Sequence, residues 1–89
     1  MAEKTYTISN EQGLQAQQVT LLVNTANKFA SEVSLEYKAK KVNLKSIMGV
    51  MSLGVTQGSD IKVIATGEDA ESVILALTET LKENNLISA

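Results

Sequence analysis

Histidine, arginine, proline, cysteine and tryptophan are all absent from this chain of 89 residues. Without histidine or cysteine there is no imidazole or thiolate to bind zinc or to activate a serine, which argues against a metal site and a hydrolase. The acids Glu68, Asp69 and Glu71 are better explained as the start of a helix than as metal ligands. Because no Gly-rich phosphate loop is present either, the sequence indicates neither an enzyme nor a bound cofactor.

Aromatic residues and strong charge are also scarce. The three aromatic rings offer nothing on which bases could stack, and a net charge of −2 does not attract a phosphate backbone. No apolar run is long enough to span a bilayer, and the N-terminus lacks the apolar segment of an export signal. We therefore expect a cytoplasmic protein that neither binds nucleic acid directly nor inserts into membranes.

The length suits one domain over residues 1–89, and the periodicity of apolar residues predicts its elements. Alternation predicts strands, and spacings of three and four predict helices. The predicted ranges are a strand at 4–9, a helix at 16–28, a hairpin of 32–37 and 42–44, a short helix at 47–53, a strand at 61–65 and a helix from 68–71 to 81. The order β-α-β-β-α-β-α predicts an α+β fold with helices packed on one face of an antiparallel sheet.

The predicted hairpin turn is unusual because Ala39 stands where a tight turn favours glycine. If the backbone there has a positive φ, alanine costs about 1 kcal/mol relative to glycine. Either the turn is of another type or the hairpin loses some stability.

Residues 46–53 are the most informative segment. Ser46 is a preferred N-cap residue at the start of the short helix, and a phosphate there would face free backbone N–H groups. The apolar residues after it point all round the helix, so some of them, including Met48 and Met51, should be exposed and could dock partners. Lys45 and Lys40 could screen the phosphate. An ordinary core helix with a satisfied N-cap would give the same pattern.

The stretch VNLKSIMGVMSLGV at residues 42–55 resembles the regulatory-serine motif of the HPr family, the phosphocarriers of the bacterial sugar phosphotransferase system. The resemblance extends over essentially the whole chain, from the loop around Gly13 to the last amphipathic helix. It implies an open-faced β-sandwich with a four-stranded antiparallel sheet and three helices on one face.

The loop that carries the family's phosphohistidine is altered here. The family pattern is Gly-Ile-His-Ala-Arg-Pro, whereas residues 13–18 read GLQAQQ. Gln15 stands at the histidine position, and its amide nitrogen is not a nucleophile near neutral pH. Gln17 replaces the arginine and offers neither its charge nor its forked geometry. We therefore expect no phosphoryl transfer through this loop.

Glutamine at the acceptor position is similar to the catabolite-repression HPr-like proteins, which keep the serine without the histidine. This resemblance implies phosphorylation of Ser46 by an HPr kinase/phosphorylase and binding to a LacI-type repressor as a corepressor of carbon catabolite control. Enzyme I and sugar-permease IIA domains are further partners that it implies. The partner-binding residues it implies lie on two neighbouring helices: Ala16, Gln17, Thr20, Ile47, Met48 and Met51.

Two alternatives stay open. The catabolite-repression proteins generally keep the Arg-Pro pair that is Gln17-Gln18 here, and the rest of the chain looks closer to ordinary HPr. The chain could thus be an HPr phosphocarrier whose active loop was replaced, by nature or by engineering. It could also be a scaffold in which neither switch operates.

Overall fold

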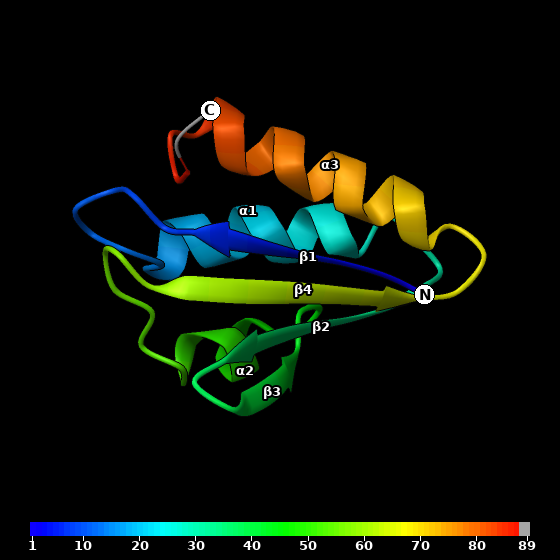
Figure 1. Cartoon of the computed structure of the whole chain (residues 1–89), viewed down its shortest axis with the longest axis horizontal. Coiled ribbons are helices and arrows are strands. Elements are labelled where there is room, and N and C mark those ends of the chain that lie inside the picture. Colours follow the sequence, from blue (N-terminus) through cyan, green and yellow to red (C-terminus); the bar gives the residue numbers. More distant parts are fainter. Residues whose placement is uncertain (88–89) are drawn as a thin grey trace.

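The structure, a computed structural model, describes residues 1–87 as a four-stranded antiparallel sheet covered by three helices (Figure 1). The elements in chain order are β1 (Ala2–Thr7), α1 (Ala16–Ala26), β2 (Glu32–Tyr37), β3 (Lys40–Asn43), α2 (Ile47–Met51), β4 (Asp60–Thr66) and α3 (Ala70–Glu83). The predicted fold class and element order are therefore confirmed. Within the described residues, none of the helices has the length and apolar content that crossing a bilayer requires.

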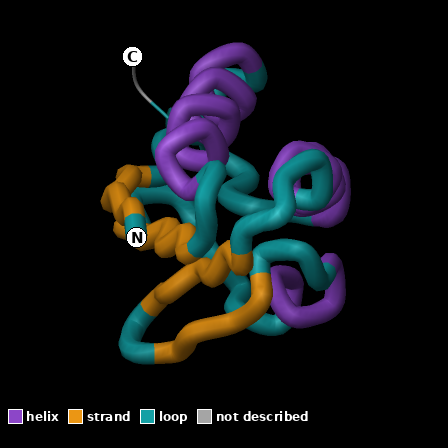
Figure 2. Tube along the Cα trace, turned by 90° about the vertical axis from the view of Figure 1, so that its right-hand side faces the viewer, coloured by secondary structure: helices purple, strands orange, loops and turns teal. Residues whose placement is uncertain are grey.

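The strands lie in the order β1-β4-β2-β3, so β1 and β3 form the two edges of the sheet. The helices lie together on one side of the sheet (Figure 2). Alternation in the strands and the stripes of α1 and α3 supply the core between the layers. The buried core includes Tyr6, Val19, Leu22, Val23, Val33, Leu35, Tyr37, Val50, Ile61, Val63, Ala65, Val73, Leu77 and Leu81.

Several elements are shorter or shifted relative to the predicted ranges. The first strand ends at Thr7 rather than residue 9, because Ile8 makes only an isolated bridge, to Ile87. Helix α1 ends at Ala26, and α2 ends at Met51 rather than residue 53. After Met51 the chain continues in tight turns, such as the 3.1 Å bond from the Leu53 N–H to the Val50 carbonyl. Periodicity located these elements but not their ends.

The sequence allowed either a strained turn with positive φ at Ala39 or another type of turn, and the structure has the strained turn. Tyr37 pairs with Lys40, so only Lys38 and Ala39 lie between the strands. Their φ angles are 49° and 66°, in the left-handed region that two-residue hairpin turns of the primed type require. This turn thus places two residues with side chains where glycine or asparagine is usual.

The acids Glu68, Asp69 and Glu71 lie at the start of α3, as predicted, and Asp69 is its N-cap residue. Of the three acids, only Glu71 lies in the first turn of the helix. The carboxylate of Asp69 turns away and accepts bonds from the backbone N–H groups of Ala30 (2.9 Å) and Ser31 (3.0 Å), and from the Ser31 hydroxyl. Asp69 therefore ties the segment before β2 to the start of α3.

Candidate functional site

Ser46 takes the N-cap position of α2, as predicted. Its backbone is extended (φ −111°, ψ 115°), and its Oγ accepts a hydrogen bond of 3.2 Å from the Gly49 N–H. Asn43 fixes the approach to the helix, because its Oδ1 accepts from the Lys45 N–H at 2.8 Å and its carbonyl accepts from the Ser46 N–H at 3.1 Å. Since the serine oxygen only accepts in the bond to Gly49, its own proton is not used there. The side chain is half-buried.

Three apolar side chains of α2 lie at the surface beside Ser46. The exposed fractions are 41% for Ile47, 84% for Met48 and 43% for Met51, whereas Val50 is buried at 1%. A five-residue helix can direct only one narrow side into the core, so the others remain in solvent. We call Ile47, Met48 and Met51 the α2 patch. This agrees with the expectation that part of the segment is exposed.

The predicted residues of the neighbouring helix lie at the N-terminal end of α1. Helices α1 and α2 pack against each other, and Figure 2 shows them side by side. Ala16 and Gln17 are exposed, and Thr20 is half-buried with its hydroxyl donating to the Ala16 carbonyl at 2.8 Å. Ala16 is therefore a surface residue at the helix start.

Leu21 is a candidate contact residue that the sequence prediction missed. It is 38% exposed and lines a hollow together with Gln17, Gln18 and Asn84. The sequence did contain a signal for this surface position, because Leu21 falls outside the helical stripe formed by Val19, Leu22 and Val23. An apolar residue off the buried face of an amphipathic helix is a candidate for contact with a partner.

The altered loop makes several hydrogen bonds within itself and to its surroundings. The Asn10 side chain donates to the Gly13 carbonyl at 2.8 Å, and the Leu14 N–H donates to the Val55 carbonyl at 3.1 Å. The exposed Gln15 is the N-cap of α1, and its N–H donates to the Gln18 Oε1 at 3.2 Å. Gln18 therefore stabilises the helix start, in the manner of the N3 residue of a capping box. The loop presents neutral amides and no nucleophile.

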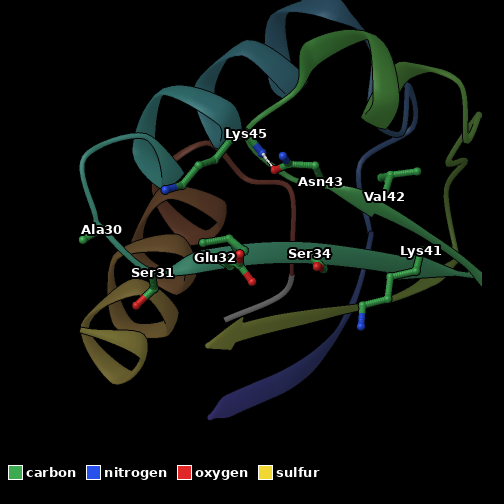
Figure 3. A pocket seen from close by; sticks show the side chains of 9 residues that line it. Ala30, Ser31, Glu32, Ser34, Lys41, Val42, Asn43 and Lys45 are labelled. Atoms are coloured by element: carbon green, nitrogen blue, oxygen red, sulfur yellow. Dashed lines mark hydrogen bonds between the residues drawn. The ribbon is translucent and has the colours of Figure 1, made fainter. Parts of the chain in front are cut away.

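The ammonium group of Lys45 binds a backbone carbonyl. Its Nζ donates to the Phe29 carbonyl at 2.8 Å, just beyond the C-terminal end of α1. Figure 3 shows its side chain reaching toward Ala30 at the rim of a cavity of about 430 Å³, which Asn43 also lines. The C-terminal end of a helix, where carbonyl groups are free, attracts a cation, which explains why the Lys45 ammonium group binds there. In this structure the Lys45 ammonium group is therefore engaged at the end of α1, and screening of a phosphate on Ser46 by Lys45 or Lys40 stays a prediction.

No group of three or more metal-binding side chains occurs within residues 1–87. The site consequently consists of one half-buried hydroxyl, an exposed apolar patch and a neutral glutamine loop. Such a surface can accept a covalent modification and bind a partner, but its own residues supply no general base or nucleophile of ordinary reactivity.

A family model described as "PTS HPr component phosphorylation site" matches residues 2–83. Among solved structures, the histidine-containing phosphocarrier protein of a Mycoplasma superposes with a TM-score of 0.96 at 34% identity, over 99% of this chain and 100% of that one. The HPr of Thermoanaerobacter tengcongensis superposes with a TM-score of 0.89 at 49% identity, over 97% of this chain and 96% of that one.

A third similar structure is Crh, the catabolite repression HPr of Bacillus subtilis, described as an intertwined dimer with a swapped domain. It gives a TM-score of 0.73 at 42% identity, over 93% of this chain and 95% of that one. The similarity thus includes relatives described as phosphocarriers and one described by its part in catabolite repression.

Proposed function

Because this chain belongs to the HPr family of phosphotransferase-system proteins, we propose that it is a regulatory member that acts through phosphorylation of Ser46. Proteins of this family are phosphocarriers and not enzymes. In the proposed scheme an HPr kinase/phosphorylase adds and removes the phosphate, and the phosphorylated protein is a corepressor for a LacI-type catabolite repressor. We place this action in the cytoplasm, where the ATP and DNA that it requires are found.

The observation that carries the proposal is the position of Ser46 beside the α2 patch. A hydroxyl at a helix N-cap can be phosphorylated without the loss of a buried donor, because its oxygen only accepts from the Gly49 N–H. The new phosphate brings about −1.5 to −2 charge units and three acceptor oxygens next to exposed Ile47, Met48 and Met51. A partner with an apolar surface and neighbouring cations would bind the modified form selectively.

The position of Lys45 supports the proposal that a cationic partner reads the charge of a phosphate on Ser46. Its ammonium group is engaged by the Phe29 carbonyl, at 2.8 Å, and is not directed at Ser46. A phosphate on Ser46 would therefore keep most of its charge for the partner's own arginine or lysine residues. In the proposed complex Ala16, Gln17 and Thr20 form the edge of the contact, with Leu21 beside them.

The glutamine loop supports a regulatory role rather than a transfer role. Gln15 is exposed at the N-cap of α1, so a partner can reach it, but its amide cannot take up a phosphoryl group. Enzyme I and sugar-permease IIA domains are proposed to dock on the same face without transfer. Crh of Bacillus subtilis, described as a catabolite repression HPr, is a similar protein.

The proposal is tested by incubating the protein with ATP and an HPr kinase/phosphorylase, locating the phosphate by mass spectrometry and measuring repressor binding of both forms. We expect phosphate on Ser46 and binding only by the phosphorylated protein. Ser46→Ala should abolish both, whereas Ser52→Ala, a nearby exposed serine, should change neither. Replacing Met48 by aspartate should leave phosphorylation intact and weaken binding. A wild-type protein that remains unmodified, or that binds equally in both forms, contradicts the proposal.

A second candidate is an HPr phosphocarrier with a replaced loop, favoured by the 49% identity to the Thermoanaerobacter HPr against 42% to Crh. Its test is the variant Gln15→His with Gln17→Arg, made both with Gln18 kept and with Gln18→Pro. Recovery of phosphoryl transfer from enzyme I in either form would favour this candidate. The absence of transfer in both would argue against it.

A further inference from the structure

The chain has very few side chains that mild oxidants attack, and most of them lie in one helix. It contains no cysteine, histidine or tryptophan, so its three methionine thioethers are the groups that a peroxide oxidises most readily. Two of the three, Met48 and Met51, belong to the five-residue helix α2, and the third is Met1. The α2 patch thus holds every thioether beyond the first residue of the chain.

Met48 is the more accessible of the two α2 thioethers. It is 84% exposed, against 43% for Met51, whereas Val50 of the same helix is buried in the core. A thioether at the surface reacts with any peroxide that reaches it, whereas a buried one must wait for the fold to open. Met48 can therefore be oxidised in the folded protein, without any movement of the core.

Oxidation changes the chemical character of the patch. A sulfur lone pair of Met48 attacks one oxygen of hydrogen peroxide, so a sulfur–oxygen bond forms as the oxygen–oxygen bond breaks. The leaving hydroxide takes the remaining proton and departs as water, while the sulfur is oxidised by two electrons to the sulfoxide. An apolar group becomes a polar one with a strong hydrogen-bond acceptor. Burying that acceptor against an apolar partner surface is unfavourable, because it loses its bond to water.

The position of Met48 links this chemistry to the proposed phosphorylation. Met48 follows Ser46 by two residues and precedes Met51 by three, so the two methionines are neighbours on the helix surface. Hydrogen peroxide carries no charge, so a phosphate on Ser46 would not repel it. A partner surface that meets the phosphate would consequently meet the sulfoxide as well.

We propose that Met48 is a site of reversible oxidation by peroxides, whose sulfoxide makes the α2 patch polar and weakens the binding of an apolar partner there. Phosphate on Ser46 and oxygen on Met48 thus have opposite effects on the same surface. A methionine sulfoxide reductase restores the thioether: two thiols form a disulfide, and the oxygen leaves as water. The effect on repressor binding rests on the proposed function, whereas the reactivity of Met48 and the change in the patch do not.

The first test treats the folded full chain with hydrogen peroxide and maps the sulfoxides by mass spectrometry. Met48 should be oxidised at least about twice as fast as Met51, in line with their exposed fractions. The midpoint of urea unfolding should not change. In native hydrophobic interaction chromatography the oxidised protein should elute earlier, and the shift should be smaller for Met48→Leu. Methionine sulfoxide reductases with a dithiol should restore the original elution.

The second test measures repressor binding of the Ser46-phosphorylated protein before and after peroxide. Oxidation should weaken binding by about tenfold, because the partner surface then covers a polar group without a donor. Each variant is compared with its own unoxidised form. Met48→Leu should lose less than about threefold, whereas Met51→Leu, the matched control that keeps Met48, should lose about tenfold like the wild type.

Three outcomes would overturn the inference. Met48 may not be the reactive site, in which case it is oxidised no faster than Met51. Oxidation may unfold the protein, in which case the sulfoxide does not act on the patch alone. Equal losses of binding in Met48→Leu and the wild type would place the effect at another residue. A phosphorylated protein that fails to bind the repressor before oxidation contradicts the proposed function instead, and the oxidation rates and the elution shift then decide the inference.

Discussion

At the scale of single residues, Ala39 carries the clearest local strain. With a φ of 66° it follows Lys38 at 49°, so both residues of the hairpin turn are left-handed. Such a turn matches the twist of the two strands, which explains why the hairpin keeps it despite the side chains. The cost is tolerated because Leu35 and Tyr37 of β2 are buried and fix the register.

We predict that Ala39→Gly raises the free energy of unfolding by about 1 kcal/mol, because glycine adopts this φ without steric cost. The measurement is equilibrium urea unfolding followed by circular dichroism. Ala76→Gly, in the middle of α3, is the contrasting control and should lower stability by a similar amount. A destabilised Ala39→Gly protein would show that the turn is not strained by its side chain.

At the scale of elements, polar side chains decide how helices and strands join. Lys45 reaches from the segment before α2 to the carbonyl of Phe29 beyond α1, and Gln18 bonds the backbone at the start of α1. Asp69 joins α3 to the segment before β2. The hydroxyl of Ser31, followed by the N–H of Ala30, lowers the pKa of the Asp69 carboxyl because these bonds favour its charged form.

We predict that Asp69→Asn lowers stability at neutral pH and makes it less dependent on pH in the acid range. Because the pKa is lower in the folded state, the bonds contribute fully above the unfolded value of about 3.9 and are lost as pH falls through the folded pKa. Urea unfolding between pH 7 and pH 3 measures this, with Glu68→Gln as a control that removes an exposed neighbouring charge. Parallel pH profiles for Asp69→Asn and wild type would argue against the assignment.

At the scale of the whole molecule, the altered loop is held against the approach to β4. Gly13 lies so close to that segment that an added Cβ would stand 2.4 Å from the Val55 carbonyl oxygen and 2.9 Å from the Thr56 Cα. The Leu14 N–H donates to the same carbonyl. The position of Gln15 therefore depends on residues some forty positions further along the chain, as well as on its own helix.

We predict that Gly13→Ala destabilises the protein by about 2–4 kcal/mol, combining left-handed strain with overpacking against backbone. Gly54→Ala is a matched control, because its φ of 63° is close to the 66° of Gly13, yet nothing lies within 4 Å of its added Cβ. That variant should lose only about 1 kcal/mol. Equal losses in the two variants, measured by urea unfolding, would show that the contact with Val55 does not matter.

Much of the fold and part of the site followed from the sequence because they depend on neighbouring residues. Alternation and helical spacing predicted all seven elements, and the N-cap chemistry of Ser46 predicted its place at the start of α2. The amide of Gln15 is not a nucleophile in any fold, so this part of the prediction needed no structure. Element ends were less accurate, as at residues 7, 26 and 51, because they depend on turns and tertiary bonds.

Only the tertiary structure decided where the long polar side chains go and which surfaces stay free. Lys45 bonds Phe29 across 16 positions, and Asp69 bonds Ser31 across 38, contacts that no local pattern encodes. The strand order put β1 and β3 at the edges of the sheet, and packing against β3 placed the α2 patch at one of these edges. Periodicity tells which residues are buried, whereas packing of distant segments fixes which polar groups meet and which apolar groups remain for partners.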